Sequence, residues 1–425
     1  GGLVIMTRTV RVGIVGLGMI SHRHMTIYRH INEQADQLGF RVEIAAVAEV
    51  IPERLKEWAA KYNIDPVNCY VDFHDLLKRN DIDCIDVCVH TNYHVPVSIE
   101  CMKAGYDVYC EKPAASTYAD CKLMLDASEK LGRKLHIQMS SVMTPQSEKA
   151  RAYMEAGKLG NPYYVNLEVF LQRRRPGYDL PDFPQGFLSK KVAGYGQSVD
   201  LGVYVIGQIL YILGCPKVAS VNGFAGQFVK HDPSRVTIEG GFDVDDTIDG
   251  TVRFENGTTF HYLNTSANNL KNYMMTYILG TDGAMELTGT DMAGYKFARP
   301  NITDDAGFMG EPEVVFHEAF DDHVTDVPLN CDAEGMAKVA EDPKAMYRYD
   351  NQCMWIAYQQ GLISEEERIN TTELALNQLL ITDGMFLSNA LGRSVTYDEI
   401  IANSPSNYVR EQMINGKLYT YDITV

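Results

Sequence analysis

Gly13-Ile-Val-Gly16-Leu-Gly18-Met-Ile-Ser21 is the stretch that decides the fold. It follows the apolar run Val10–Val15 and leads into helical spacing, which predicts a strand, a glycine turn and a helix. Gly16 permits a tight turn, Gly18 lets backbone amides approach a pyrophosphate, and Ser21 takes the place of the third fingerprint glycine. A turn without a ligand is the alternative. The predicted dinucleotide contacts are Gly16, Gly18, Met19 and Ile20.

Short apolar strands alternate with amphipathic helical stretches from Val10 to about Met143. This alternation indicates a parallel sheet covered by helices on both faces, so we predict an α/β Rossmann domain over residues 7–143. Its predicted strands are Val10–Val15, Val42–Ala48, Ile85–Val89, Asp107–Cys110 and Lys134–Gln138. Its predicted helices are Ser21–Leu38, Pro52–Tyr62, Phe73–Arg79, Val95–Ala104 and Tyr118–Leu131.

The pattern changes after Pro145, where one predicted helix, Ser147–Ala156, precedes longer strands of alternating polar and apolar residues. Asn256-Gly257 predicts a type I′ hairpin, in which both turn residues have positive φ. We therefore predict a second, α+β domain over residues 144–425 with a largely antiparallel open sheet. Its predicted strands are Tyr163–Gln172, Ala219–Val229, Thr247–Phe254, Thr258–Asn264 and Met274–Leu279.

Two later segments of this domain differ in character. Residues 301–350 are acidic and weakly periodic, and we interpret them as a solvated excursion in preference to a lid. Near the end of the chain, Asn370 and Glu373 form a capping pair. Glu373–Ala390 then predicts a helix, which Gly392 ends.

The bulk properties narrow the class of protein. At 425 residues the chain is too long for one ordinary core, and a prior of about 150 residues per domain agrees with two domains. Its net charge of −18 repels phosphate backbones and anionic surfaces, so we expect neither nucleic acid nor membrane as partner. The nine cysteines include no Cys-x-x-Cys pair and indicate a reducing compartment. With no signal peptide or transmembrane run recognised, we expect a cytoplasmic protein.

Glu49 ends the second predicted strand. A carboxylate there can accept hydrogen bonds from the ribose of a bound dinucleotide and repel a 2′-phosphate, so the sequence favours NAD over NADP. Glu49 lies further from Gly18 than the usual spacing of about 20 residues, because the first predicted helix is lengthened. A solvated strand end is the alternative.

Thr91-Asn92-Tyr93-His94 follows the predicted strand Ile85–Val89 and opens a helix. Its polar side chains could face the cofactor or simply cap that helix. The candidates for cofactor contact in this turn are Thr91, Asn92 and His94.

Glu111-Lys112-Pro113 closes the predicted strand Asp107–Cys110, in the same sheet as the glycine loop. A lysine at the carboxyl end of such a strand points into the crevice where a nicotinamide ring lies. Pro113 fixes its own φ and can adopt the cis form, which turns the lysine out of the strand end. We predict Glu111 and Lys112 at the cofactor, with Lys112 handling a proton; a surface lysine in a turn is the alternative.

Asp200 and Tyr204 are four residues apart at the start of the predicted helix Ser198–Leu213, so we expect them on one helical face. A free phenol has a pKa near 10, but a neighbouring ammonium favours the phenolate. Lys112 and Tyr204 would then form a proton relay, and we predict Lys112, Tyr204 and Asp200 as catalytic residues. Alone, Asp200 could instead complement the helix dipole and Tyr204 could be a core aromatic.

Arg173-Arg174-Arg175-Pro-Gly-Tyr178 ends a predicted strand of the second domain. Arg173, Arg174 and Tyr178 are candidates for binding hydroxyls or an anionic substrate, with a solvated sheet edge as the alternative. The histidines and cysteines lack zinc-ligand spacing, so we predict no metal site.

Several motifs in this order make the chain resemble the glucose-fructose oxidoreductase / inositol dehydrogenase / MocA family. They are the Gly16-x-Gly18 loop, Glu49, the Thr-Asn-x-His94 turn, the Glu111-Lys112-Pro113 corner, the Gly157-Lys-Leu-Gly160 turn and the Asp200-x-Gly202-x-Tyr204 helix. The resemblance implies an N-terminal Rossmann domain, a C-terminal domain whose open sheet serves homo-oligomerisation, and hydride exchange with sugars, cyclitols or glycosides.

The chain departs from the family pattern at three places. It has Tyr204 where many members have histidine, and Gly207 where they have a second aspartate. Tyrosine is typical of the branch that includes glucose-fructose oxidoreductase and dihydrodiol dehydrogenase. The proline usual between Thr91 and Asn92 is missing, and Ser140-Ser-Val-Met-Thr-Pro145 lacks the polar residue common before its proline. We therefore do not carry over the substrate of inositol dehydrogenases.

We expect NAD-dependent oxidation of a ring secondary hydroxyl of a sugar or glycoside, at C3, to the ketone by hydride transfer. An alternative is a glycoside hydrolase or lyase in which NAD oxidises C3 transiently and is restored after elimination. A second alternative is a non-catalytic regulator that senses a dinucleotide, against which the intact Lys112 and Tyr204 argue.

Overall fold

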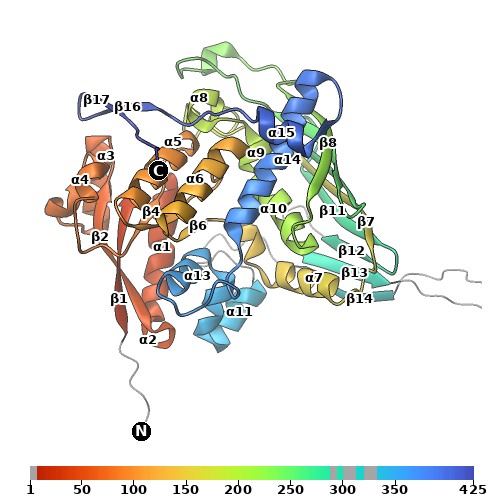
Figure 1. Cartoon of the computed structure of the whole chain (residues 1–425), viewed down its shortest axis with the longest axis horizontal. Helices are drawn as coiled ribbons and strands as arrows, with labels where there is room; N and C mark the ends of the chain where they lie inside the picture. Colours follow the sequence, from red (N-terminus) through yellow and green to blue (C-terminus); the bar gives the residue numbers. More distant parts are fainter. Residues whose placement is uncertain (1–6, 288–293, 300–312, 320–332) are drawn as a thin grey trace, which may run out of the picture. The chain divides into compact units, whose positions relative to one another are not determined.

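The computed structural model describes residues 7–287, 294–299, 313–319 and 333–425, which form two compact units (Figure 1). The first unit contains residues 7–143 together with the segments 333–376 and 406–425. The second unit contains the described parts of 144–326 together with 377–405. The chain thus changes unit after Met143, where the sequence places its domain boundary, but two later segments return to the first unit.

The first unit is built on a six-stranded sheet in the order β3-β2-β1-β4-β5-β6, and all its neighbouring strands are parallel. The strands are β1 (Arg8–Val15), β2 (Phe40–Ala48), β3 (Cys69–Tyr70), β4 (Cys84–Val87), β5 (Asp107–Cys110) and β6 (Leu135–Ile137). The predicted parallel sheet is confirmed, although β3 was not predicted because two residues show no periodicity. The strand order reverses between β1 and β4, and ligands of such sheets bind outside the carboxyl ends of the strands at that point.

Helices surround this sheet and include three from far along the chain. They are α1 (Met19–Glu33), α2 (Ala35–Leu38), α3 (Pro52–Tyr62), α4 (Phe73–Leu76), α5 (Thr91–Lys103), α6 (Tyr118–Leu131), α11 (Ala333–Glu341), α12 (Met346–Tyr349) and α13 (Asn351–Gln359). Trp355 of α13 stacks on Tyr109 of β5 with ring centroids 6.3 Å apart. Trp355 and Ile356 also share one buried cluster with Val10 and Ile14 of β1. The core of the first unit is therefore completed by residues outside the predicted Rossmann domain.

The C-terminal segment 406–425 is held on the same unit. Asp120 of α6 accepts hydrogen bonds from the Ser406 hydroxyl at 2.7 Å and from the backbone N–H of Tyr408 at 2.9 Å. The Val409 N–H donates to the Asn92 carbonyl at 2.8 Å. The segment ends in a hairpin of β16 (Glu411–Ile414) and β17 (Lys417–Thr420). It therefore lies against the first turn of α5.

The second unit contains a nine-stranded sheet in the order β14-β13-β12-β11-β7-β10-β9-β8-β15. The strands are β7 (Pro162–Gln172), β8 (Val218–Gly226), β9 (Thr247–Phe254), β10 (Thr259–Asn268), β11 (Tyr273–Gly280), β12 (Ala284–Leu287), β13 (Gly294–Arg299), β14 (Glu313–Ala319) and β15 (Val395–Thr396). β7 and β10 pair in parallel, and the other neighbours are antiparallel. The predicted α+β class is confirmed. Of the acidic stretch 301–350, residues 301–312 and 320–332 lie outside the described residues.

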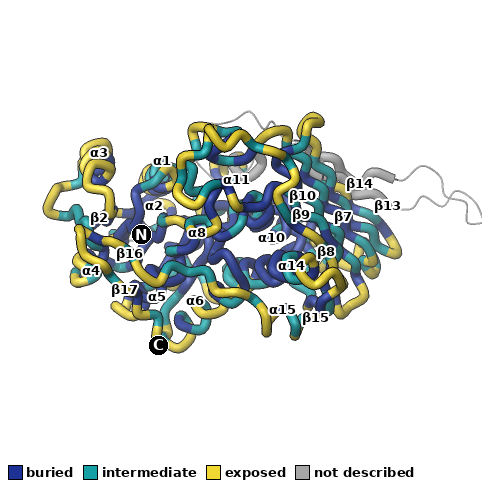
Figure 2. Tube along the Cα trace, turned by 90° about the horizontal axis from the view of Figure 1, so that it is seen from above, coloured by how far each residue is buried: buried dark blue, intermediate teal, exposed yellow. Residues whose placement is uncertain are grey.

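The helices of the second unit are α7 (Pro145–Glu155), α8 (Lys190–Ala193), α9 (Gln197–Asp200), α10 (Gly202–Leu213), the end of α14 (Thr371–Leu391) and α15 (Tyr397–Asn403). Most of α10 is buried (Figure 2). The single helix predicted over Ser198–Leu213 is wrong, because the chain breaks at Leu201 and bends by 47° between Lys190–Asp200 and Gly202–Leu213. Among the described residues no single helix is both long enough and apolar enough to cross a membrane. Within the described part of the chain, only the bent pair Lys190–Asp200 and Gly202–Leu213, taken together, reaches the required length and hydropathy.

The type I′ turn predicted at Asn256-Gly257 is also wrong. Only Gly257 of the two has positive φ, at 90°. Arg253 of β9 pairs with Thr259 of β10, and the Phe254 N–H donates to the Thr258 carbonyl at 3.0 Å, which leaves a three-residue loop between them. A loop of this length needs the left-handed conformation at its last residue only. Asn256 contributes to the turn through its side chain, because its Oδ1 accepts a hydrogen bond from the Thr258 N–H at 3.1 Å.

Candidate active site

The glycine loop between β1 and α1 has the geometry of a phosphate site. Gly16 has a φ of 91°, and a Cβ atom there would lie 2.8 Å from the backbone carbonyl of Cys88, so only glycine fits. Gly18 is the N-cap of α1, and a Cβ there would meet nothing within 4 Å. No described side chain caps α1, so its first N–H groups can face an anion. Met19 and Ile20 beside them are 54% and 36% exposed.

Ser21 occupies the position of the third glycine and ties α1 to α3. It is buried, and its hydroxyl donates to the Gly18 carbonyl at 2.6 Å. The same hydroxyl accepts a hydrogen bond from Trp58 Nε1 at 2.8 Å. A small polar side chain therefore replaces glycine here without disturbing the close packing of the loop.

The Glu49 carboxylate is bonded to the glycine loop. It lies at the end of β2, where Oε2 accepts the Leu17 N–H at 2.9 Å and Oε1 accepts the Ile51 N–H at 3.0 Å. Arg54 of α3, which was not predicted, places Nη1 3.4 Å from Oε2 and keeps its side chain 46% exposed. Glu49 thus holds the loop in addition to placing a negative charge beside it.

The first turn of α5 carries Thr91, Asn92 and His94. Thr91 is partly exposed, whereas Asn92 and His94 are buried. His94 Nδ1 lies 2.7 Å from the carbonyl of Pro113 and Nε2 lies 3.0 Å from that of Val89. Burial lowers the pKa of His94, and a neutral ring has one N–H, which we assign to the shorter contact. His94 therefore supports the backbone just after Lys112.

Glu111, Lys112 and Pro113, here called the Lys112 corner, follow β5 directly. The Glu111 N–H donates to the Val87 carbonyl at 3.0 Å, so the corner still belongs to the sheet edge. The Lys112–Pro113 peptide is cis. Glu111 is 4% exposed, and its Oε2 accepts the backbone N–H of Lys112 at 2.9 Å. The Glu111 carboxylate is thus turned into the protein, while Lys112 is partly buried at the edge where the strands end.

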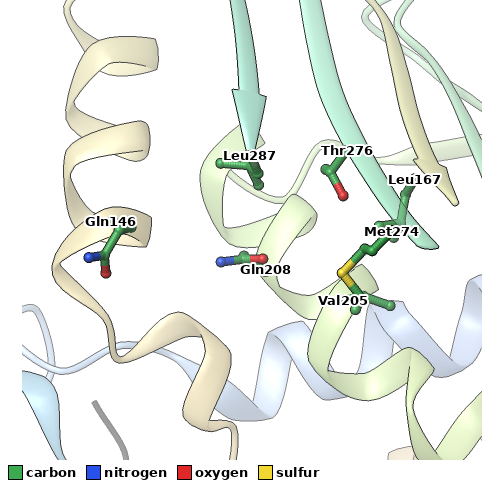
Figure 3. A pocket seen from close by; sticks show the side chains of 7 residues that line it. All are labelled: Gln146, Leu167, Val205, Gln208, Met274, Thr276 and Leu287. Carbon is green, nitrogen blue, oxygen red and sulfur yellow. The ribbon is translucent and has the colours of Figure 1, made fainter. Parts of the chain in front are cut away.

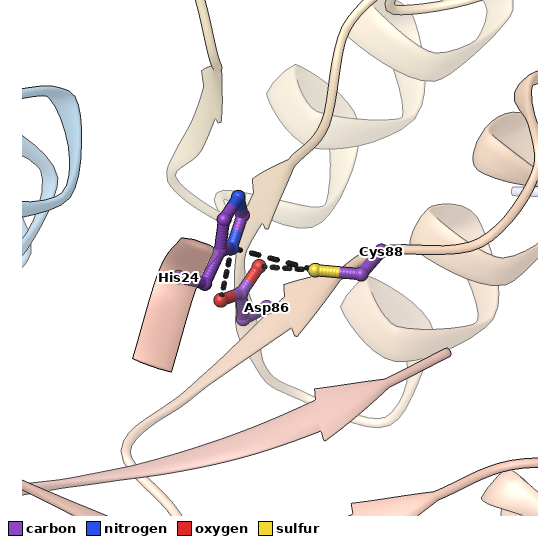
Figure 4. A group of neighbouring side chains, drawn as sticks. All are labelled: His24, Asp86 and Cys88. Carbon is purple, nitrogen blue, oxygen red and sulfur yellow. Dashed lines mark hydrogen bonds and ion pairs between the residues drawn. The ribbon is translucent and has the colours of Figure 1, made fainter. Parts of the chain in front are cut away.

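A buried polar cluster behind the corner escaped the sequence analysis. His24 of α1 lies between two carboxylates, with Nδ1 2.8 Å from Asp86 Oδ2 and Nε2 2.8 Å from Glu111 Oε1. The Tyr28 hydroxyl donates to Asp86 Oδ2 at 2.8 Å. Cys88 Sγ lies 3.4 Å from both His24 Nδ1 and Asp86 Oδ1 (Figure 4). The signal that could have found this cluster is Asp86, a charge inside an apolar strand that requires partners.

His24, Asp86 and Cys88 are also side-chain types that bind metal ions, and their ligand atoms lie within 4.8 Å of one another. Burial raises the pKa of the Cys88 thiol, so the thiolate that a metal requires is disfavoured. His24 Nδ1 is already at hydrogen-bonding distance from Asp86. Hydrogen bonds between the members therefore explain the cluster.

Asp200 and Tyr204 lie on the two sides of the break at Leu201. Asp200 ends α9, and Tyr204 is in the first turn of α10. The Tyr204 N–H donates to the Leu201 carbonyl at 3.0 Å, which is a three-residue spacing. Both side chains are half-buried. Lys112 belongs to the first unit and this pair to the second, so their meeting around one substrate stays a prediction.

The start of α9 is fixed by Asp245. Its Oδ1 accepts the Gly196 N–H at 2.7 Å, and its Oδ2 accepts the Ser198 hydroxyl. A Cβ at position 196 would lie 2.0 Å from the Asp245 carbonyl, so the chain can pass here only as glycine. This anchor positions Asp200 two residues after Ser198.

The arginine stretch after β7 divides into exposed and buried members. Arg173 and Arg174 are exposed. Arg175 is 2% exposed, and its Nε and Nη2 lie 2.7 and 3.2 Å from the two carboxylate oxygens of Asp179. Tyr178 is 6% exposed, packs 4.6 Å from the Arg175 guanidinium, and accepts the Asp232 N–H at 2.6 Å. Arg175 and Tyr178 therefore build the loop itself, and the two exposed arginines are the ones that can reach a ligand.

A small pocket lies within the second unit (Figure 3). It is lined by Gln146, Leu167, Val205, Gln208, Met274, Thr276 and Leu287. All seven side chains are neutral, so the pocket offers neither an acid nor a base.

Two matches to one protein family cover most of the chain. Residues 10–139 match the GFO/IDH/MocA oxidoreductase family, NAD-binding Rossmann fold, and residues 147–286 match its C-terminal domain. The chain belongs to this family. It is an NAD-binding oxidoreductase, and the open space at Gly18 and the uncapped start of α1 fit the pyrophosphate of that cofactor.

Named relatives are dehydrogenases of a glucoside, of inositol and of levoglucosan. D-glucoside 3-dehydrogenase of Escherichia coli (strain K12) is 27% identical over 259 residues, 58% of this chain and 68% of that protein. Inositol 2-dehydrogenase of Salmonella typhimurium is 28% identical over 175 residues, 41% of this chain and 49% of that protein. The alignments thus span about two thirds and about half of these relatives. Levoglucosan dehydrogenase in complex with NADH shares the fold, with a TM-score of 0.71, 21% identity and coverage of 92% of this chain and 99% of that one.

Proposed function

We propose that this protein oxidises a ring secondary hydroxyl of a sugar or glycoside, at C3, to the ketone. The observation that carries the proposal is the position of Lys112, one residue beyond Glu111 at the carboxyl end of β5, in the sheet whose β1 leads into the glycine loop. An ammonium at this edge stands where the nicotinamide of a bound dinucleotide is expected. The name of the relative D-glucoside 3-dehydrogenase supports the choice of C3.

The protein residues have distinct roles in this proposal. Tyr204 accepts the proton of the reacting hydroxyl, and the Lys112 ammonium favours the phenolate that makes this transfer feasible near neutral pH. Asp200 binds a neighbouring hydroxyl and orients the ring. Bound NAD would supply the acceptor for the hydride of the carbinol carbon, and loss of that hydride together with the hydroxyl proton would leave the ketone.

Lys112→Met and Tyr204→Phe test these roles. A positioned acid or base supplies about 10² to 10⁴ in rate, so each variant should lose at least about 100-fold in turnover of a glycoside while it still binds NAD. Turnover is followed by NADH absorbance and NAD binding by calorimetry. Lys103→Met, a surface lysine paired with Asp422, is the matched control and should behave as wild type. Near-unchanged turnover in both active-site variants would refute the assignment.

The same assay separates the rival functions. A hydrolase or lyase with transient C3 oxidation releases the aglycone without accumulating NADH, whereas a dehydrogenase produces NADH and ketone in equal amounts. A dinucleotide-sensing regulator retains NAD and turns over no member of a broad sugar panel. Lys112 and Tyr204, both present, argue against the regulator.

We also infer that the sheet of the second unit mediates homo-oligomerisation. Aromatic side chains lie next to one another on β7 and β11, with ring centroids 6.2 Å apart for Tyr164 and Tyr277 and 5.9 Å apart for Phe170 and Tyr273. Tyr273 is 43% exposed. A row of partly exposed aromatics on a sheet face favours association with a second copy. Tyr273→Glu should shift the sedimentation coefficient toward the monomer; an unchanged value contradicts this inference.

We propose that the protein works in a reducing, cytoplasmic compartment, because its described cysteines are free thiols. Eight cysteines are described, and within the described residues all eight are free thiols. Most of them are buried, where a thiol behaves as a small hydrophobe. Disulfides persist in oxidising compartments, so this set of thiols suits a reducing one. Fractionation of cells that express the tagged chain tests the proposal.

A further inference from the structure

We propose that His24 is a positioning residue for Lys112: as an imidazolium it joins Asp86 to Glu111 and thereby fixes the peptide that carries the lysine. The inference rests on the role given to Lys112 in the proposed function. It assigns a task to the buried cluster behind the corner.

The hydrogen bonds form one continuous path. The Tyr28 hydroxyl and His24 Nδ1 both lie 2.8 Å from Asp86 Oδ2, and His24 Nε2 lies 2.8 Å from Glu111 Oε1. The other oxygen of Glu111 accepts the backbone N–H of Lys112 at 2.9 Å. Both oxygens of the Glu111 carboxylate are thus occupied, so its plane is fixed, and with it the direction of the peptide that leads into Lys112.

The charges require a protonated ring. Asp86 is 0% and Glu111 4% exposed, and buried carboxylates need a compensating charge. A neutral imidazole has one N–H and would turn a lone pair toward one of the two carboxylates, whereas the imidazolium donates to both. Burial lowers the pKa of His24, but the charges and hydrogen bonds of its neighbours, with the charge of Asp86 the largest of them, together more than compensate, and the pKa is raised well above its usual value.

The other groups that face His24 agree with this charge. Cys88 is a thiol whose pKa is raised by burial, and Tyr28 is a phenol whose pKa is likewise raised by burial. The Tyr109 ring of β5 packs with its centroid 5.6 Å from that of His24. The Gln352 amide of α13 donates to the His24 carbonyl at 3.2 Å and leaves the ring untouched. Among these described neighbours His24 is the only side chain that can be cationic.

A second histidine holds the other end of the corner. His94 Nδ1 lies 2.7 Å from the Pro113 carbonyl, so Lys112 stands between one residue held by His24 and one held by His94. His24 lies on α1, whose start is the glycine loop, and His94 lies on α5. Helix α1 therefore has two tasks in this proposal: its first turn presents backbone amides to the cofactor phosphates, and its His24 supports Lys112.

The first experiment reads the charge of His24 directly. Ring nitrogens of ¹⁵N-histidine are observed by NMR in the protein without added cofactor, and the signal of His24 is identified by its absence in His24→Gln. Both nitrogens should be protonated from about pH 6 to pH 8. Glu111→Gln, which removes one carboxylate, should lower the pH at which the ring loses its proton and provides a second assignment. A neutral ring at pH 7, or one metal ion per chain that Cys88→Ser removes, overturns the proposal.

The second experiment reads the effect on Lys112. His24→Gln should lower kcat by about 10- to 100-fold, the usual cost of removing a supporting partner, while Kd for NAD changes by less than about threefold. Because His24 acts through Lys112, the double variant with Lys112→Met should be no slower than Lys112→Met alone. A double variant slowed by the product of the two effects overturns the proposal.

His136→Gln is the matched control. His136 is as buried as His24 and lies in the same unit, but its Nε2 faces Asn351 at 3.4 Å and not the corner. It should keep kcat even where it lowers stability. If Lys112→Met keeps wild-type turnover, the proposed function fails. If Lys112→Met is slow and His24→Gln turns over as wild type, only the positioning role fails.

Discussion

The backbone N–H of Leu17 donates a hydrogen bond of 2.9 Å to the carboxylate of Glu49. This bond joins the end of β2 to the glycine loop that follows β1. The residue expected to select the cofactor therefore also shapes the loop that is expected to bind its phosphates, and Arg54 lies 3.4 Å from the same oxygen. We therefore expect cofactor selectivity and loop geometry to be coupled through the Glu49 side chain.

Glu49→Ser should raise the use of NADP relative to NAD. The change removes the carboxylate that repels a 2′-phosphate and leaves the exposed Arg54 able to bind one. The ratio of kcat/KM for NADP to that for NAD should rise by at least about tenfold, since one favourable charge pair is worth about 1.4 kcal/mol or more. Steady-state kinetics with both cofactors measures it. In Glu49→Ser with Arg54→Ala the gain should be smaller, because only the loss of repulsion remains; an equal gain there would contradict the role of Arg54.

Two glycines of the same loop should respond in opposite ways to alanine. Gly16→Ala forces positive φ and a 2.8 Å contact with the Cys88 backbone, so it should cost about 1 to 3 kcal/mol of stability or more. Gly18→Ala meets no neighbour and should leave stability within about 1 kcal/mol. It should nevertheless raise Kd for NAD by at least about tenfold, because the methyl group occupies the space of the pyrophosphate. Thermal unfolding and calorimetric NAD titration measure both; tight NAD binding by Gly18→Ala would contradict the site.

His136 should make the protein sensitive to acid. Burial lowers the pKa of His136 to about 3, so the folded state keeps it neutral while the unfolded state gains a proton below about pH 6.5. Its contribution to stability is complete above that pH and is lost as the pH falls toward 3. Between pH 7 and pH 5 the stability of the wild type should fall by about 2 kcal/mol more than that of His136→Gln. Urea denaturation at the two pH values measures the difference, and parallel losses would contradict the prediction.

Alanine variants at Arg175 and Arg174 should have different effects, the first on stability and the second on substrate binding. Arg175→Ala leaves Asp179 as a buried charge without its partner and should cost about 3 to 5 kcal/mol of stability. Arg174 is exposed, so Arg174→Ala should change stability by less than about 0.5 kcal/mol. If Arg174 binds substrate as predicted, its variant raises KM without lowering the melting temperature. An unchanged KM in Arg173→Ala and Arg174→Ala would remove this stretch from the substrate site.

Local patterns predicted the parts of the fold that local physics controls. Pro52–Tyr62, Asp107–Cys110 and Tyr118–Leu131 have the predicted bounds, because proline, glycine and capping residues mark their ends. The helix over Ser198–Leu213 failed, since its apolar spacing continues through a break that is set by the hydrogen bonds between Asp245 and the start of α9. Those bonds join residues about 50 positions apart and leave no trace in the local pattern.

The same distinction applies to the site. Gly16, Gly18, Glu49 and Lys112 could be proposed from the sequence because each follows a strand of a parallel sheet, and such strands end at one edge. His24, Asp86 and Arg54 could not, because their significance comes from partners on other strands and helices. Asp86 was the one hint, as a charge within an apolar run.

By itself, the sequence determined the alternation of strands and helices from Val10 to Met143, the glycine loop and the residue that closes β5, since these depend on periodicity and on backbone preferences that each residue brings with it. Only the tertiary structure decided which side chains hold Lys112, that α13 and the C-terminal segment complete the first unit, and where the apolar helix of the second unit breaks. These features depend on hydrogen bonds and packing between residues far apart in the chain, and such contacts exist only once the chain has folded.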